Sequence, residues 1–156
     1  MKLSQPQQAV AQDNSRFKIL VSGRRFGKTT LAIRELCYHA RHPNKLCWYV
    51  APSYRQARQI AWLKLKKKLS ELRWAKKFNE ADLTCHLKNN SVIALRGADN
   101  PDSLRGVGID FLVIDESADV SEQSWTEVLR PTLSDTKGRA LFTGTPKGHN
   151  WFYDLY

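Results

Sequence analysis

The sequence predicts an α/β domain with a mainly parallel central sheet, and three observations lead to this fold class. The runs Leu46–Val50 and Phe111–Ile114 are apolar throughout, as expected for strands buried on both faces of a parallel sheet. Segments with helical spacing of apolar residues alternate with such runs along the chain. The 156 residues, 42% of them apolar, are enough for one compact domain with one core.

The elements are expected in the following order. Residues 3–15 form a short polar helix or loop, 17–22 a strand, and 28–41 a helix that ends at His42-Pro43-Asn44. A strand follows at 46–50, and Ser53 caps a helix from 54 to about residue 70. The arms 83–87 and 91–95 read as a hairpin, and residues 97–108 as a polar loop. The remaining elements are a strand at 111–114, a helix at 122–130 capped by Ser121 and stopped near Pro131, and a strand at 139–142.

The stretch between the first strand and the first long helix resembles a phosphate-binding loop. The run Ser22–Thr30 carries Gly23 and Gly27, then Lys28 and Thr29, and a helix opens at once. In such a loop, backbone N–H groups and a helix N-terminus surround a phosphate chain, the lysine reaches the β/γ-phosphates, and the Thr hydroxyl holds Mg²⁺. Ser22 stands where the usual pattern has its first glycine. The alternative interpretation is an ordinary strand–helix turn with a chance lysine.

A second motif follows a later strand and favours nucleotide hydrolysis. Asp115 and Glu116 come directly after Phe111–Ile114, so they belong to the same sheet edge as the loop. An Asp there can hold Mg²⁺, and a Glu beside it can polarise a water for attack on the γ-phosphate. The run Thr143-Gly144-Thr145 follows a third strand and reads either as a γ-phosphate sensor or as a simple turn. Together these motifs predict hydrolysis of ATP or GTP.

The charge of the chain favours a polyanionic partner. Its net charge is +10, which suits DNA or RNA but does not by itself separate them from an acidic membrane or protein. Many basic residues fall in one stretch, which is either a solvated helix face or a phosphate-backbone contact surface: Arg55, Arg58, Lys64, Lys66, Lys67, Lys68, Arg73, Lys76 and Lys77. The three cysteines form no metal motif and are expected to be buried and reduced.

The chain resembles the ATPase domain of the large terminase subunit, the DNA-packaging motor of tailed phages. The resemblance runs nearly end to end and is carried by Pro6-Gln-Gln8, Ser22–Thr29, Val50-Ala-Pro-Ser-Tyr-Arg-Gln-Ala57, Ser103-Leu-Arg-Gly106, Phe111–Glu116 and Thr143-Gly-Thr-Pro-Lys-Gly148. It implies a three-layer P-loop NTPase fold of the ASCE/RecA-like class, with ATP and Mg²⁺ as cofactors.

The resemblance also implies a role for each matching residue. Gln8 matches the glutamine that reads adenine, and Arg24 the basic residue of the family's phosphate loop. Asp115 and Thr29 match the Mg²⁺ ligands and Glu116 the catalytic base. Arg105 matches an arginine proposed to reach a neighbouring subunit's ATP as a finger, although it could equally be a loop arginine paired with a nearby carboxylate. The remaining nucleotide contacts implied are Ser22, Gly23, Arg25, Phe26, Gly27, Lys28, Thr30, Thr143, Gly144 and Thr145.

By the same resemblance, the partners are double-stranded DNA, the portal protein and the small terminase subunit, in the host cell cytoplasm and with no membrane. A homo-oligomeric ring is expected during packaging and a monomer in solution. Residues 1–156 read as one ATPase domain that lacks its C-terminal part, with no nuclease domain. Two alternatives stay open: the first motor domain of a superfamily 2 helicase, and a non-catalytic prophage remnant that binds DNA.

Overall fold

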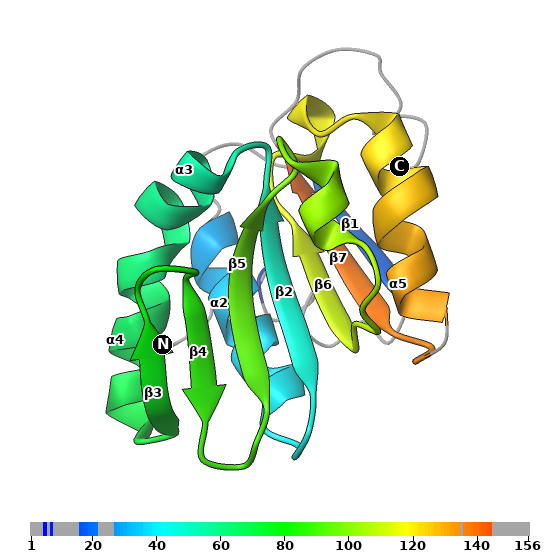
Figure 1. Ribbon diagram of the computed structural model, residues 1–156. Coiled ribbons are helices and arrows are strands. Elements are labelled where there is room, and N and C mark those ends of the chain that lie inside the picture. Colours follow the sequence, from blue (N-terminus) through cyan, green and yellow to red (C-terminus); the bar gives the residue numbers. More distant parts are fainter. Residues whose placement is uncertain (1–4, 6, 8–15, 22–26, 135, 145–156) are drawn as a thin grey trace.

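The computed structural model, which describes residues 5, 7, 16–21, 27–134 and 136–144, has three layers, with one sheet between two layers of helices (Figure 1). The seven strands lie in the order β1-β7-β6-β2-β5-β4-β3. The first five run parallel, and β4 is antiparallel to both of its neighbours, β5 and β3. Their bounds are β1 Phe17–Val21, β2 Leu46–Ala51, β3 Ala75–Asn79, β4 Thr84–Leu87, β5 Val92–Gly97, β6 Phe111–Ile114 and β7 Arg139–Gly144.

The helices cover the two faces of the sheet separately. One face carries α2 (Lys28–Ala40) and a continuous helical segment made of α3 (Tyr54–Ala57), the π-helix η2 (Arg58–Trp62) and α4 (Leu63–Leu72). The other face carries the π-helix η5 (Ser124–Leu129), which continues into α5 (Arg130–Ser134). The short 3₁₀ turns η3 (Pro101–Leu104) and η4 (Ser117–Asp119) lie in the connections before and after β6.

Alternate residues of the central strands enter the two cores. Cys47 and Tyr49 of β2 pack on the face of α2 and α4, whereas Trp48 and Val50 pack on the face of η5 and α5. Both faces of the strand are therefore buried, which is the reason for its uninterrupted apolar sequence. Cys37, Cys47 and Cys85 are all buried and free, as expected. Burial raises the pKa of the Cys37 thiol to about 11 and that of Cys85 to about 12.

Two of the helices differ from the prediction, one in its internal geometry and the other in where it ends. The predicted helix from residue 54 starts at its predicted cap, where the Ser53 hydroxyl accepts from the Gln56 backbone N–H, but it contains a π segment. The predicted stop near Pro131 is wrong, because the helix continues to Ser134. The π-helix ends at Leu129 and α5 starts at Arg130, so Pro131 lies just after the π segment, inside a continuous helix.

Strand β3 was not expected from the sequence, which assigned its lysines to a basic run. It lies at the edge of the sheet, where it pairs with β4, and Lys76 and Lys77 are exposed. Lysines on an edge strand hinder pairing with another chain, and they also conceal the alternation that marks a strand. Among the described residues, no helix has the length and apolarity needed to cross a membrane.

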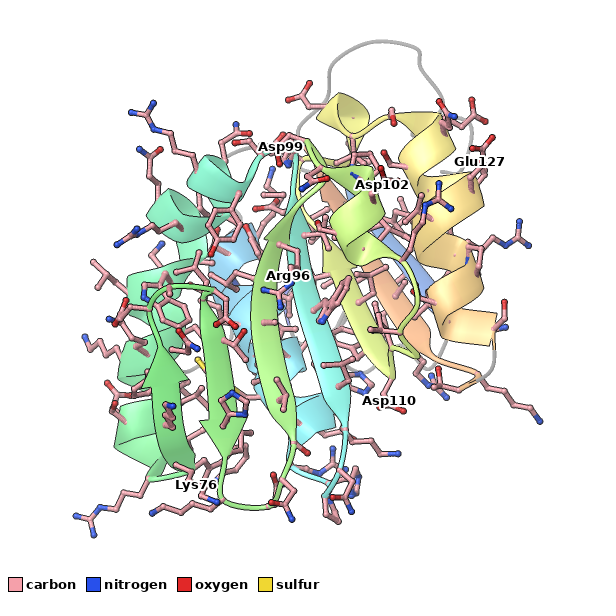
Figure 2. All side chains as sticks on the ribbon, viewed as in Figure 1. Lys76, Arg96, Asp99, Asp102, Asp110 and Glu127 are labelled. Atoms are coloured by element: carbon pink, nitrogen blue, oxygen red, sulfur yellow. The ribbon has the colours of Figure 1, made fainter. Side chains whose placement is uncertain are left out.

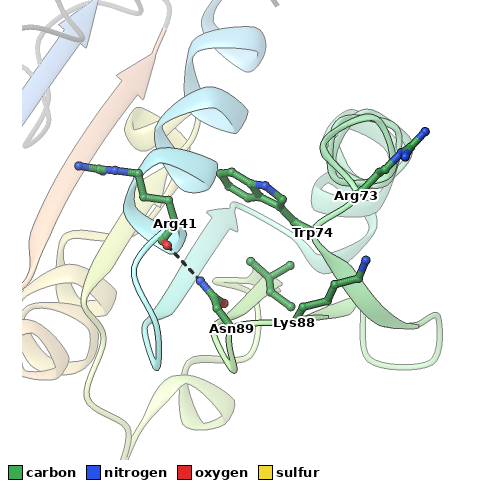
Figure 3. Close-up of a pocket in the computed structure, with 6 residues that line it drawn as sticks. Arg41, Arg73, Trp74, Lys88 and Asn89 are labelled. Atoms are coloured by element: carbon green, nitrogen blue, oxygen red, sulfur yellow. Dashed lines mark hydrogen bonds between the residues drawn. The ribbon is translucent and has the colours of Figure 1, made fainter.

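The two ends of the parallel strands are easily distinguished in Figure 2, and each forms one edge of the sheet. Asp99 and Asp102, which follow β5, lie at the upper edge, where the parallel strands end, and Asp110, which precedes β6, lies at the lower edge. A cavity of about 250 Å³ lies at the lower end of α2 (Figure 3). Beside it, the Asn89 side-chain amide donates to the carbonyls of residues 40, 41 and 42, which closes the C-terminus of α2.

Candidate nucleotide site

A cavity of about 340 Å³ lies where the parallel strands end, at the N-terminus of α2. Three parts of the chain form its walls: the start of α2, the carboxylates after β6, and the helical segment on the same face. The lining residues are Gly27, Lys28, Thr29, Thr30, Ile60, Lys64, Asp115 and Glu116. The structure therefore brings together the lysine, the hydroxyl and the two carboxylates that the sequence places far apart.

Gly27 forms the cap of α2 in a conformation that suits glycine. Its φ of 79° is left-handed, and its carbonyl accepts both the Leu31 N–H at 3.1 Å and the Gln7 side-chain amide at 3.1 Å. A Cβ at this position would stand 2.3 Å from Gln7 Nε2, so an alanine would be strained by the backbone and by contact with Gln7. Lys28 follows directly and is 8% exposed, with its side chain directed across the cavity toward Glu116.

Asp115 is held by three donors. The Tyr49 hydroxyl donates to Oδ2, the Thr143 hydroxyl donates to Oδ1 at 2.7 Å, and the Glu116 backbone N–H donates to Oδ1 at 2.9 Å. Tyr49 is fully buried, and burial, followed by the charge of Asp115, raises the pKa of its phenol, so it remains a donor. The carboxylate is buried, and three fixed donors from three elements leave it little freedom to rotate.

Glu116 has a backbone that is uncommon for its residue type. Its φ of 48° and ψ of 51° are left-handed, which for a residue other than glycine costs on the order of 1 kcal/mol or more. This conformation begins the turn η4 and places the Glu116 Oε1 atom 3.9 Å from Lys28 Nζ. The glutamate is partly exposed, with 24% of its side chain accessible, so water can reach it.

Thr143 and Gly144 end β7, the strand between β1 and β6. Thr143 is fully buried, with its hydroxyl on Asp115 and its carbonyl accepting from the Ser117 hydroxyl at 3.0 Å. Gly144 pairs in register with Val21, the last residue of β1. A displacement of the end of β7 would therefore move the hydroxyl that donates to Asp115.

The pocket contains two oxygen-bearing side chains of the kind that Mg²⁺ binds. Mg²⁺ usually takes one or two protein oxygens and completes its shell with phosphates and water. Thr29 and Asp115 both line the pocket and supply a hydroxyl and a carboxylate. In the described part of the chain, no group of three or more His, Cys, Asp or Glu side chains could hold a metal by itself.

Arg105 lies away from this pocket. Its Nε donates to Asp102 Oδ1 at 3.3 Å, and 53% of its side chain is accessible. It lines a different cavity together with Glu127 and Pro131. An exposed ion pair of this kind is weak, so it restrains the arginine side chain little.

Seven predicted site residues lie outside the described part of the chain: Gln8, Ser22, Gly23, Arg24, Arg25, Phe26 and Thr145. Conversely, four described residues at the site were not predicted: Gln7, Tyr49, Ile60 and Lys64. Tyr49 was read only as a buried strand residue and Lys64 only as one of many lysines. A tyrosine within a strand that is buried on both faces has a hydroxyl that needs a buried partner, and this signal could have been followed up.

Comparison with known proteins identifies the relatives of this chain. The profile of the family described as "Terminase large subunit, T4likevirus-type, N-terminal" matches residues 19–156. The terminase large subunit of Thermus phage G20c is 32% identical over 170 residues, which covers 96% of this chain but 35% of that protein. The chain thus spans about a third of this curated relative.

Solved structures agree with this relationship. The large terminase ATPase domain of Thermus phage P74-26 superimposes with a TM-score of 0.89 at 29% identity, covering 99% of this chain and 69% of that one. The large terminase of a thermophilic bacteriophage, solved in complex with ADP, shares the fold with a TM-score of 0.82 at 20% identity, and the match covers 99% of this chain and 42% of that one. The predicted P-loop fold with a mainly parallel sheet is confirmed.

Proposed function

The chain belongs to the N-terminal domain family of phage terminase large subunits, and from this premise we propose that it is an ATP-hydrolysing DNA-packaging motor domain. It would bind Mg-ATP in the pocket at the start of α2 and couple hydrolysis to movement of double-stranded DNA into a procapsid. The observation that carries the proposal is the pocket itself, where Lys28 Nζ faces Glu116 Oε1 at 3.9 Å beside the fixed carboxylate of Asp115. The thermophilic bacteriophage terminase that shares this fold was solved with ADP.

The geometry suggests how this chain's residues would act. Lys28 would contact the β/γ-phosphates, because it lines the cavity at the N-terminus of α2, where the helix dipole favours anions. Glu116 would accept the proton of a water that attacks the γ-phosphate. Asp115 and Thr29 would hold Mg²⁺, which neutralises charge on the phosphates when bound. Thr143 would report the state of this shell to β7, because its hydroxyl touches Asp115.

Two substitutions test the assignment. Lys28→Ala should abolish Mg-ATP binding in calorimetry, whereas Glu116→Gln should keep binding and lose turnover in a phosphate-release assay. Glu122→Gln, an exposed carboxylate on the other helical layer, is the matched control and should behave as the wild type. A Glu116→Gln protein that hydrolyses ATP at the wild-type rate would rule out Glu116 as the base.

Arg105 is proposed to act in trans. It does not line the nucleotide pocket of its own subunit, and its pair with Asp102 is an exposed one that restrains it weakly. In a ring of subunits, it would offset phosphate charge in the transition state of the neighbouring site. Arg105→Ala should then leave ATP binding intact and lower turnover, and mixing it with Glu116→Gln subunits should restore part of the activity. Failure of the mixture to recover any turnover would argue against a role between subunits.

The DNA partner is proposed from the basic segment. Arg55, Arg58 and Arg73 are exposed on the helical layer or just after it, whereas Lys66 is already paired with Glu80 at 2.6 Å. Binding of duplex DNA should weaken steeply as salt rises, because each phosphate contact releases a counterion. By family resemblance, the portal protein and the small terminase subunit are further partners, in the cytoplasm of the host.

A further inference from the structure

The basic helical segment forms one wall of the nucleotide pocket. Ile60 and Lys64 line the same cavity as Lys28, Thr29 and the two carboxylates. These two residues are four positions apart, so they lie on the same side of the helix. The other lining residues include those to which we assign the phosphates and the metal, so Lys64 shares one cavity with these groups.

Packing fixes the position of this wall. Ala61, Leu65 and Leu69 are fully buried on the adjacent side of the helix, and they belong to the core beneath α2. Because this side is anchored, the helix cannot move away from the pocket without exposing three apolar side chains. Leu36 and Cys37 of α2 belong to the same core as these three residues, so α4 packs against α2.

A local departure from α-helical geometry occurs where the wall meets the pocket. The π-helix η2 spans Arg58–Trp62 and includes Ile60. A π segment changes the phase between the helix before it and the helix after it, and such segments are frequent at functional sites. Trp62 secures the segment, because its indole N–H donates to Glu80 at 2.5 Å and its ring is buried.

We propose that Lys64 is a second phosphate-binding lysine of the nucleotide pocket, supplied by the basic helix. The deduction rests on the ATP site proposed above and adds a residue to it. The triphosphate brings several negative charges into a cavity that already contains the carboxylates of Asp115 and Glu116. Lys28 is the lysine of α2 that meets this charge, and the ammonium group of Lys64 offsets part of the remainder from the wall that the basic helix forms.

Lys64→Ala and Lys67→Ala test the proposal as a matched pair. Both remove one exposed lysine from α4, but Lys67 does not line the pocket. Lys64→Ala should weaken Mg-ATP binding about 3–10-fold in calorimetry, as expected for a partly exposed charge-assisted contact. Lys67→Ala should bind as the wild type, and Lys64→Arg should recover most of the affinity. Thermal unfolding of each variant checks that the fold is intact.

The outcomes separate this deduction from the proposed function. If Lys64→Ala binds Mg-ATP as tightly as the wild type while Lys28→Ala does not bind, Lys64 makes no phosphate contact. Equal weakening by Lys64→Ala and Lys67→Ala would show a general effect of helix charge and would overturn the proposal as well. If Lys28→Ala also binds as the wild type, the nucleotide site itself is wrongly assigned.

Discussion

Removing the Tyr49 hydroxyl should loosen Asp115 without disturbing the core. Tyr49→Phe keeps the ring, which is fully buried between β2 and the α2 layer, and deletes one of the three donors to the carboxylate. A hydrogen bond to a charged acceptor contributes about 1.5–3 kcal/mol. At about 2–4 °C per kcal/mol for a domain of this size, a loss of about 2 kcal/mol lowers Tm by about 4–8 °C.

The same change should weaken Mg²⁺ binding at the proposed site. Groups that orient a metal ligand typically contribute about 10–100-fold to metal affinity, so the Mg²⁺ concentration needed for ATP binding should rise by about tenfold or more. Urea unfolding measures the free energy of unfolding, and magnesium titration in the presence of ATP measures the Mg²⁺ concentration that ATP binding requires.

Tyr54→Phe is the control, because it also deletes one tyrosine hydroxyl. That hydroxyl donates to the Ala81 backbone carbonyl at 3.2 Å in an exposed position, where a neutral hydrogen bond contributes about 1 kcal/mol or less. The reasoning is refuted if Tyr49→Phe unfolds with the same free energy as Tyr54→Phe, or if its magnesium dependence equals that of the wild type.

Three further predictions concern stability. Burial, and then nearby charges of which Lys18 is the largest, lower the pKa of His39 from 6.5 to about 4. The folded state therefore resists protonation of His39. The stability that neutral His39 contributes is complete above pH 6.5 and is lost as pH falls toward 4, by up to about 1.4 kcal/mol per pH unit. His39→Gln should flatten this dependence of the unfolding free energy on pH, as measured by urea titrations at several pH values. Asn89→Ala removes the amide that closes α2 and should cost about 1–2 kcal/mol in chemical denaturation. Leu65→Ala leaves a cavity at a fully buried position and should cost about 2–5 kcal/mol by the same measurement, and a loss below about 1 kcal/mol would contradict the packing described.

The parts of the fold that depend on local pattern could be predicted from the sequence. The strand Leu46–Ala51 was evident because both of its faces are buried, and Ser53 was evident as a cap because its side chain acts on the next turn. The edge strand β3 was missed because its exposed lysines resemble a helix surface. The π segments were missed because a π turn is decided by packing, not by the spacing of apolar residues.

The site was predictable to a similar extent. Lys28, Asp115 and Glu116 could be placed at one sheet edge, because parallel strands end there and the motif residues follow directly. The contact of Tyr49 with Asp115 joins β2 to the end of β6 and depends on sheet register, which the sequence does not state. Whether Lys64 faces the pocket depends on the direction in which the helix presents it after the π turn, which is likewise decided by tertiary packing.

Because β7 lies between β1 and β6, it sets the distance between the ends of these two strands. Neighbouring strands lie about 4.8 Å apart, so the interposed strand separates the exits of β1 and β6 by about 9.6 Å. With β1 beside β6, the carboxylates would stand one strand closer to the α2 N-terminus, and the space that a phosphate chain and its ion require would be lost. The width of the opening is therefore fixed by backbone hydrogen bonds, and side-chain substitutions can change its chemistry while leaving its width unaltered.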